Sequence, residues 1–191
     1  LDASRVTGDV IDGGDGRDGA GYVPGEGVGA ALLKPLSAAL RDRDHIHGLI
    51  RGSAVNHDGK TNRYSVPNPV AQAEVIRRAH AGIDPRTIGT IEAHGTGTPL
   101  GDPVEINGLK KAYAELLAAS GADSHPEGHC VLGAVKTHIG HLELAAGVAG
   151  VIKVLLQLKH RTLVRNLHCD EINPYIDFEG SPFRPSLENR P

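Results

Sequence analysis

The sequence predicts an α/β fold, because short apolar runs alternate along the chain with stretches whose apolar residues recur at helical spacing. Runs of this kind without a polar face are typical of strands buried inside a sheet. Strands are expected at residues 25–34, 46–55, 87–93 and 130–135. Helices are expected at residues 36–43, 69–81, 102–119 and 143–159.

The first two expected strands differ in side-chain bulk. Residues 25–34 carry glycine at alternate positions, which allows another backbone to approach closely. Their GxGxG spacing lacks the strand–turn–helix order of a dinucleotide-binding loop, so no cofactor is expected there. Pro35 ends this strand and opens the short helix at 36–43. Residues 46–55 are apolar enough to be central in a sheet.

Turn residues separate the elements that follow. Pro69 opens a helix, and Asp84-Pro85 breaks the chain before the strand at 87–93. The proline-rich tail from residue 161 is expected to form extended strands and turns that wrap the body. The helix at 102–119 is indicated by apolar residues at helical spacing, namely Val104, Leu109, Tyr113, Leu116 and Leu117.

Composition excludes several classes of function. A formal net charge of −3 and an aromatic content of 3% give no basis for nucleic-acid binding. The longest apolar stretch, 144–158, is short for a membrane span and is interrupted by Lys153. Cys130 and Cys169 are too few for a disulfide framework and fit a reducing cytoplasm, where we expect the protein to be located.

Residues 1–20 are rich in glycine and aspartate, and we expect a flexible segment there. Within it, residues 13–18 match the start of a calcium-binding nonapeptide repeat, but such repeats need several stacked copies. A single copy favours a loop over a calcium site. Because the chain opens on Leu1 rather than methionine, we expect it to be an excerpt of a longer polypeptide.

Two glycine-flanked histidine loops carry the chemistry. Residues 92–98 (Glu-Ala-His-Gly-Thr-Gly-Thr) and 136–141 (Lys-Thr-His-Ile-Gly-His) each follow an expected strand, where α/β proteins usually place their sites. A lone histidine at a loop end often only satisfies backbone groups, but two such histidines favour a site. His94, His141 and Lys136 together could stabilise a developing anion. Zinc bound by His94, His138 and His141 is the competing interpretation.

The residues around these loops resemble the β-ketoacyl synthase (ketosynthase) domains of modular type I polyketide synthases. Residues 92–105 resemble the first histidine motif of that family, and residues 135–143 resemble the second. Further matches lie at 21–29, 51–59 and 173–178. The resemblance covers residues 21–185, leaves 186–191 as a tail, and is greatest to ketosynthases served by a separate acyltransferase.

The resemblance implies a thiolase-like layered αβαβα fold, of which this chain would hold the C-terminal half and the last strand of the N-terminal half. It also implies decarboxylative Claisen condensation between an acyl thioester and a malonyl thioester, in polyketide and antibiotic biosynthesis. His94 and His141 would assist decarboxylation and stabilise the enolate, and Lys136 would orient the site electrostatically. Glu143 would support the local network, as would Thr96 and Thr98.

The same resemblance implies the partners. The substrates would arrive on the phosphopantetheine arm of an acyl carrier protein, no cofactor or metal would be bound, and the enzyme would be a homodimer. The nucleophilic cysteine is missing, because the family carries it upstream of the glycine-rich strand, and neither Cys130 nor Cys169 lies in that context. The chain should therefore need an N-terminal half that bears the cysteine.

Two departures leave alternatives open. His138 stands where the family usually has asparagine, which puts the hydrogen bonding around Lys136 in question. The absent nucleophile leaves a non-condensing scaffold that binds carrier protein as the second hypothesis, and a zinc hydrolase as the third. The intact pair His94 and His141 favours the condensing enzyme, since a scaffold has no need of both.

Overall fold

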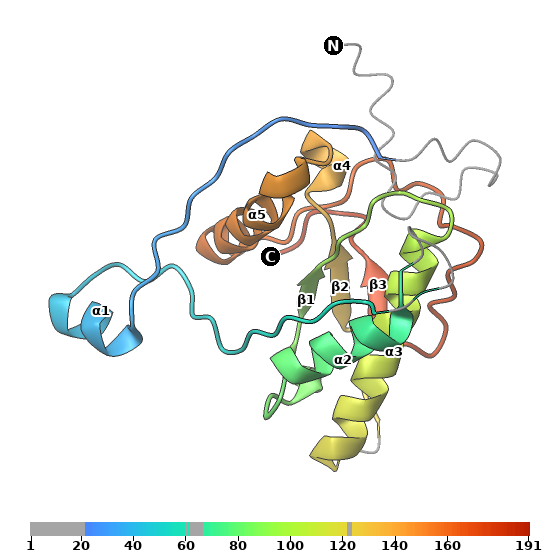
Figure 1. Ribbon diagram of the computed structural model, residues 1–191, viewed down its shortest axis with the longest axis horizontal. Coiled ribbons are helices and arrows are strands. Elements are labelled where there is room, and N and C mark those ends of the chain that lie inside the picture. The colour runs from blue at the N-terminus through green and yellow to red at the C-terminus, as the bar shows by residue number, and fades with distance from the viewer. Residues whose placement is uncertain (1–21, 60, 62–66, 122–123) are drawn as a thin grey trace.

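The computed structural model describes residues 22–59, 61, 67–121 and 124–191, and a parallel sheet lies at its centre (Figure 1). The strands stand side by side in the order β1, β2, β3, so β2 has a neighbour on both sides. Thr90 is paired with Val131, and Cys130 with Phe183. The strands are β1 (Thr90–Glu92), β2 (Cys130–Gly133) and β3 (Phe183–Pro185). Every residue of β2 is buried, as its apolar sequence predicts.

Helices cover the two faces of this sheet. Figure 1 shows α4 and α5 on one side of it and the packed pair α2 and α3 on the other. Their bounds are α2 (Pro69–Ala79), α3 (Gly101–Ser120), α4 (Lys136–Ile139) and α5 (Ala146–His160), and short 3-10 turns occupy Pro85–Thr87 and Glu143–Ala145. The α/β class expected from the sequence is confirmed.

The core lies between α3 and the sheet. Tyr113 of α3 and Phe183 of β3 are almost wholly buried, and their rings meet edge to face with centroids 4.7 Å apart. Leu109 and Leu132 fill the same cluster. The helical spacing read from the sequence thus predicts the buried face of α3 correctly. The helix α2 begins at Pro69 as predicted, because the Asn68 side chain accepts hydrogen bonds from the first free amides of the helix.

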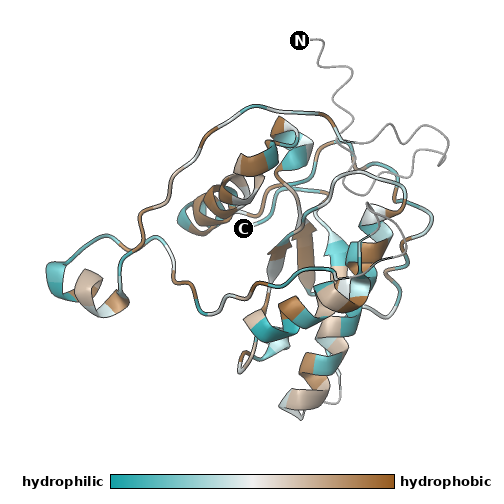
Figure 2. Cartoon of the chain, viewed as in Figure 1, coloured by the Kyte–Doolittle hydropathy of each residue, from teal (hydrophilic) through white to brown (hydrophobic). Residues whose placement is uncertain are grey.

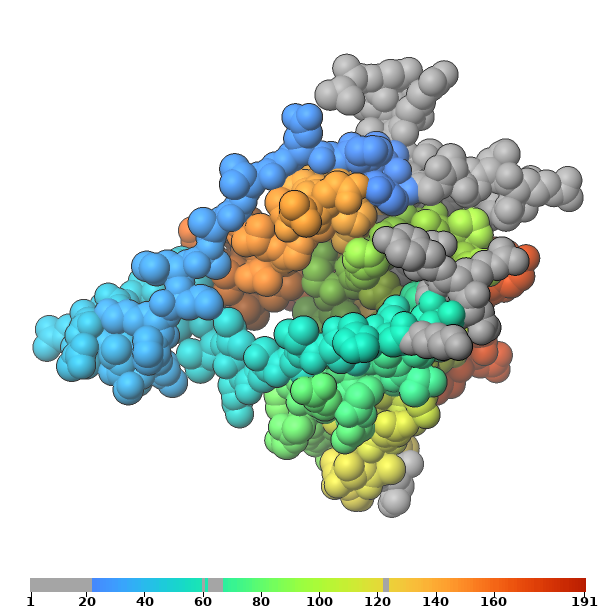
Figure 3. Space-filling view, viewed as in Figure 1, coloured from blue at the N-terminus to red at the C-terminus, as the bar shows by residue number. Residues whose placement is uncertain are grey.

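The expected strands at 25–34 and 46–55 are wrong for this chain by itself. Residues 22–59, which we call the arm, are extended apart from α1 (Leu36–Asp42) and project from the body (Figures 1 and 3). Val28 and Leu32 are each 98% exposed. A strand needs a neighbour to take its ladder hydrogen bonds, and within the described part of the arm only Pro24 has one, a bridge to His141.

The arm lies close to α5 at its glycines. A Cβ atom on Gly29 would stand 2.8 Å from a methyl of Val148, and one on Gly48 would stand 3.0 Å from Leu155. These two glycines make room for side chains of α5, whereas the close backbone approach predicted for 25–34 is seen at Gly25, which lies against the Ile139 carbonyl. Between the arm and α5 lies an apolar cavity of about 650 Å³, and Figure 2 shows strongly hydrophobic residues along α5.

The C-terminal segment from residue 161 is hydrogen-bonded to the sheet and to itself. Ser186 donates its amide to the Leu132 carbonyl at 3.0 Å, and Leu163 and Arg190 form an antiparallel bridge. The segment 1–20 and the calcium-like residues 13–18 lie outside the described residues. Among the residues that are described, no helix is long and apolar enough to cross a membrane.

Candidate active site

The two histidine loops meet at one edge of the sheet. His94 lies two residues beyond the end of β1, and His141 follows the short helix α4 after β2. Their imidazole rings stand edge to face, with centroids 5.5 Å apart and an interplanar angle of 85°. Adjacent parallel strands bring their carboxyl ends together, which is why two loops separated by more than forty residues converge here.

The His94 loop is held by carboxylates from the first turns of α3. Glu105 accepts the backbone amide of His94 at 2.7 Å with one oxygen and that of Gly95 at 2.9 Å with the other. Thr96 donates its amide to Asp102 at 3.2 Å. Side chains of α3 therefore hold the backbone of the loop, and the bonds to Glu105 are charge-assisted.

Asp102 is the most strongly perturbed carboxyl group at the site. It is 3% exposed, and its burial, together with the nearby Glu105 charge, raises its pKa to about 8. The hydrogen bonds that it accepts from loop amides oppose this shift but do not cancel it. Asp102 is thus mostly protonated at neutral pH, which spares the site a second buried negative charge.

Thr96 and Thr98, expected to support the site, lie in the loop as structural groups. Their hydroxyl oxygens are 3.2 Å apart, and Thr98 Oγ1 accepts the amide of Gly101 at the start of α3. The threonine pair thus satisfies a free amide at the helix N-terminus and joins the loop to the helix.

His141 is oriented by the backbone around it. Its amide donates to the Val23 carbonyl of the arm at 2.8 Å, and its ring nitrogen Nδ1 accepts the amide of Glu143 at 2.9 Å. A neutral imidazole whose Nδ1 accepts must carry its proton on Nε2. His141 therefore presents an N–H donor on the side of the ring away from Glu143.

The arm adds a residue that the sequence did not single out. Tyr22 donates its hydroxyl to Glu143 Oε1 at 2.6 Å, and its ring packs against His141 with centroids 4.8 Å apart. The side chain of Glu143 thus faces Tyr22, while its backbone amide holds the His141 ring. The supporting role expected of Glu143 stays a prediction.

Lys136 lies close enough to both histidines for its charge to act on them. It is only 6% exposed, and burial lowers its pKa, while the charges of Glu105 and Glu92 act in the opposite direction. Partial burial also lowers the pKa of both His94 and His141, and the charge of Lys136 lowers each further. Both imidazoles are thereby favoured in the neutral form that donates one N–H.

The zinc hypothesis does not fit the positions of the histidines. His138 is exposed, and its Nδ1 is engaged with Thr137 Oγ1 at 2.9 Å. His94 and His141 face each other, but across the described ranges no group of three or more His, Cys, Asp or Glu side chains is arranged to hold a metal ion. Tetrahedral zinc sites in proteins need at least three such ligands.

Both cysteines lie in the hydrophobic core. Cys130 begins β2 and is fully buried, and its burial raises the pKa of its thiol to about 11. Cys169 is 4% exposed. Because the thiolate is the reactive form of cysteine, Cys130 in this setting is a small core residue and not a nucleophile.

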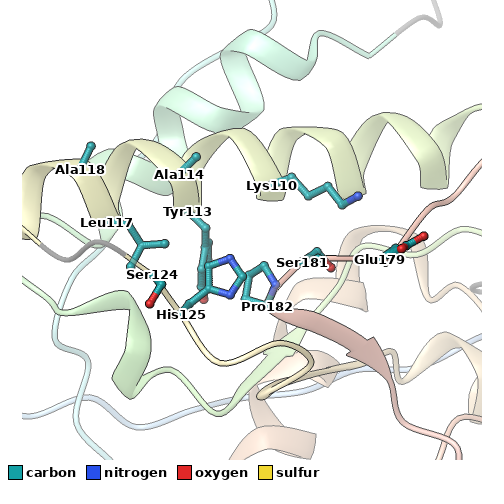
Figure 4. A pocket seen from close by; sticks show the side chains of 11 residues that line it. Lys110, Tyr113, Ala114, Leu117, Ala118, Ser124, His125, Glu179, Ser181 and Pro182 are labelled. Carbon is teal, nitrogen blue, oxygen red and sulfur yellow. The ribbon is translucent and has the colours of Figure 1, made fainter.

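A second cavity, of about 620 Å³, is lined by neither His94 nor His141. It is bounded by one side of α3 and by residues 179–182, and His125, Tyr113 and Pro182 are among the residues that line it (Figure 4). Lys110 at its rim donates to the Asp177 carbonyl. Its lining includes none of His94, His141 and Lys136, so this cavity lies outside the candidate site.

Sequence reasoning missed the groups that hold the loops. Asp102 and Glu105 lie within the first motif and Glu92 opens it, but the motif by itself gives none of the three a role. A signal was present: two carboxylates three residues apart open a helix, so they share one face of its first turns. Which backbone amides they would accept could not be read from that spacing.

Comparison with known proteins agrees with this geometry. Residues 47–170 match the family described as β-ketoacyl synthase, C-terminal domain. The chain belongs to this family. It is 59% identical over 172 residues to polyketide synthase PksN and 57% identical over 175 residues to PksL, both from Bacillus subtilis strain 168. These matches cover 89% and 91% of the chain.

Solved ketosynthases share the fold. The ketosynthase from module 6 of the bacillaene synthase of Bacillus subtilis 168 superimposes on 96% of this chain with a TM-score of 0.87 and 42% identity. The oxazolomycin ketosynthase domain of Streptomyces albus JA3453 superimposes on 89% of it with a TM-score of 0.80 and 46% identity. The chain spans 32% of the first of these chains and 29% of the second, and 3% of the length of PksN.

Proposed function

We propose that this chain is the decarboxylating part of a polyketide ketosynthase that condenses an acyl thioester with a malonyl thioester. The observation that carries the proposal is the meeting of His94 and His141, with ring centroids 5.5 Å apart, beside the buried Lys136. Neutral imidazoles that donate N–H groups stabilise an oxyanion as it forms, at no cost in reorganisation.

The proposed chemistry runs in two steps. In the first, the bond between the carboxylate and the α-carbon of the malonyl group breaks, CO₂ leaves, and the electron pair becomes an enolate whose oxygen accepts hydrogen bonds from His94 and from His141 Nε2. In the second, the enolate carbon forms a bond to the acyl carbonyl carbon, and the cysteine thiolate that carried the acyl group leaves. Lys136 favours the neutral form of both imidazoles throughout.

The acyl-carrying cysteine belongs, in this proposal, to the remainder of the ketosynthase. The exposed apolar side chains of the arm support this, as do those of α5, where Val151 is 50% exposed and Leu156 is 49% exposed. Exposed apolar surface of this extent marks an interaction site. The remainder of the enzyme would cover α5 and supply strands beside residues 25–34 and 46–55.

The other partners follow from the family. We propose that the malonyl group arrives on the phosphopantetheine arm of an acyl carrier protein, that the complete ketosynthase is a homodimer, and that its acyltransferase is a separate protein. No bound cofactor is needed for the two steps above. The non-condensing scaffold remains the second hypothesis, and the experiment below separates the two.

The test uses a chimera in which this chain replaces the matching third of the bacillaene module 6 ketosynthase. The unsubstituted chimera should load an acyl group, release CO₂ from malonyl carrier protein and condense the two. His94→Ala should leave acyl loading intact, as seen by intact mass, and reduce decarboxylation by about 10²-fold or more.

His125→Ala is the matched control, since His125 lines the distant cavity, and it should behave as the unsubstituted chimera. A scaffold would give a chimera that binds carrier protein and releases no CO₂. Normal decarboxylation by His94→Ala would refute the role proposed for the imidazole pair.

A further inference from the structure

A buried ion pair links the end of β1 to the helix α5. Lys153 Nζ lies 2.6 Å from Glu92 Oε2, and the two side chains are 9% and 13% exposed. The other ion pairs among the described residues join side chains that are at least 36% exposed. Buried ion pairs add little to stability compared with apolar residues of similar volume. Stability alone therefore does not explain why this pair is present.

The second oxygen of the Glu92 carboxylate makes a further contact that suggests a role for the pair. Glu92 Oε1 accepts the backbone amide of Val135, the residue immediately before Lys136. Glu92 is itself two residues before His94 in the chain. One side chain therefore joins the strand that delivers His94 to the turn that delivers Lys136.

Two glycines make room for this arrangement. Gly133 is paired with Glu92 across the sheet, and a Cβ atom there would stand 2.7 Å from Lys153 Nζ. A Cβ atom on Gly150 of α5 would stand 3.1 Å from Glu92 Cγ. Contact this close leaves no space for alanine unless the pair moves. The absence of side chains at Gly133 of β2 and Gly150 of α5 thus leaves the space that the pair occupies.

We infer that Glu92 is a positioning residue, which sets the Lys136 turn against the His94 loop by accepting the Val135 amide, and that Lys153 neutralises the charge that this acceptor brings into the core. The inference rests on the proposed function, because it assigns a role in the same site. It predicts that the acceptor oxygen is required and that the ion pair as such is not.

Two double variants of the chimera separate these roles. Glu92→Gln with Lys153→Met removes both charges but keeps an amide oxygen that can accept the Val135 amide. Glu92→Met with Lys153→Met removes both charges and the acceptor, and leaves a neutral, apolar pair of similar volume. Both variants avoid an unpaired buried charge, which would by itself unfold the core.

The glutamine variant should decarboxylate malonyl carrier protein within about threefold of the unsubstituted chimera, while the methionine variant should lose about 10²-fold in kcat, the scale expected for a displacement of about 1 Å. KM for carrier protein and acyl loading should stay unchanged in both, since the docking surface and the nucleophile are untouched. Equal rates in the two variants, whether both high or both low, would overturn the inference.

Crystal structures of the two variants give a second measurement that does not depend on activity. The distance between the His94 and His141 ring centroids should be unchanged in the glutamine variant and altered in the methionine variant. The same holds for the position of the Val135–Lys136 backbone relative to the His94 loop. Should the methionine variant fail to fold, Glu92→Leu with Lys153→Met removes the same acceptor and both charges with a branched side chain, and its kcat should fall to the same extent. An inactive unsubstituted chimera would count against the proposed function, whereas unaltered loop geometry in the methionine variant counts against the role of Glu92.

Discussion

At the scale of single residues, the proposed site requires two imidazoles that stay neutral. Partial burial and the charge of Lys136 both lower the pKa of His94 and of His141. An imidazole with a lowered pKa keeps its neutral form down to a lower pH than the usual value of about 6.5. The site is therefore suited to work at neutral pH without titrating there.

This sets the expected pH dependence. The decarboxylation rate of the chimera should stay level through neutral pH and fall only below about 6.5, as His94 and His141 become protonated. The rate is measured by CO₂ release from malonyl carrier protein across the acidic range. An acidic midpoint above the usual imidazole value would contradict the lowered pKa values.

Asp102 gives a second prediction, on stability. Its pKa is about 8 in the folded chain against an ordinary 3.8, so the folded state binds the proton more tightly than the unfolded state. That contribution to stability is complete below the ordinary value and is lost as pH rises toward about 8. Asp102→Asn keeps an oxygen that can accept the Thr96 amide and removes the charge.

As pH rises from about 5 to about 8, the unsubstituted chain should therefore lose stability relative to Asp102→Asn. The free energy of unfolding of the variant minus that of the unsubstituted chain should increase over this range. Urea denaturation at the two pH values measures the difference, and the histidine titrations that the proteins share cancel in it. A difference that is constant with pH would show that Asp102 keeps an ordinary pKa.

At the scale of elements, the arm is the part of the chain whose local sequence and structure disagree. Residues 25–34 and 46–55 have the composition of strands, yet they run extended and exposed, with Ile50 71% exposed and Val55 84% exposed. Local sequence favours an extended backbone, but a strand is completed only by a neighbour that takes its ladder bonds. The proposed remainder of the ketosynthase would be that neighbour.

Hydrogen–deuterium exchange tests this element directly. Amides of residues 25–34 and 46–55 should exchange quickly in the chain alone and become protected in the chimera, because ladder hydrogen bonds form there. Amides of β2, which already has neighbours on both sides, serve as the internal control and should be protected in both. Equal exchange of the arm in the two proteins would remove the case for added strands.

At the scale of the whole molecule, His94 and His141 meet at one edge of the sheet, and both cysteines of the chain are buried in its core. Cys130 is fully buried, with a pKa of about 11, and Cys169 is 4% exposed. A thiol that is buried and protonated does not attack a thioester. Loading and decarboxylation should therefore separate between this chain and the rest of the enzyme.

The chain alone should not self-acylate. Incubation with an acyl thioester followed by intact-mass measurement should give the unmodified mass, while the chimera under the same conditions gains one acyl group. An adduct mapped to Cys130 or Cys169 in the chain alone would contradict the assignment of the nucleophile to the missing part.

The sequence by itself determined the α/β class, the helices and strands of the body, the buried face of α3 and the family. These follow from local properties, because apolar spacing, the proline that opens α2 and two uninterrupted motifs suffice to predict them. The same motifs predicted His94, His141 and Lys136 as one site, because adjacent parallel strands end at one edge of a sheet.

Only the tertiary structure decided how that site is held. That Glu105 accepts the His94 and Gly95 amides, and that Glu92 joins Val135 to Lys153, depend on contacts between residues up to 61 positions apart. Whether the arm forms strands also depends on tertiary structure, since a strand exists only when a neighbour pairs with it. Local propensity specifies what a segment can become, and long-range hydrogen bonding and burial determine which of those states the chain adopts.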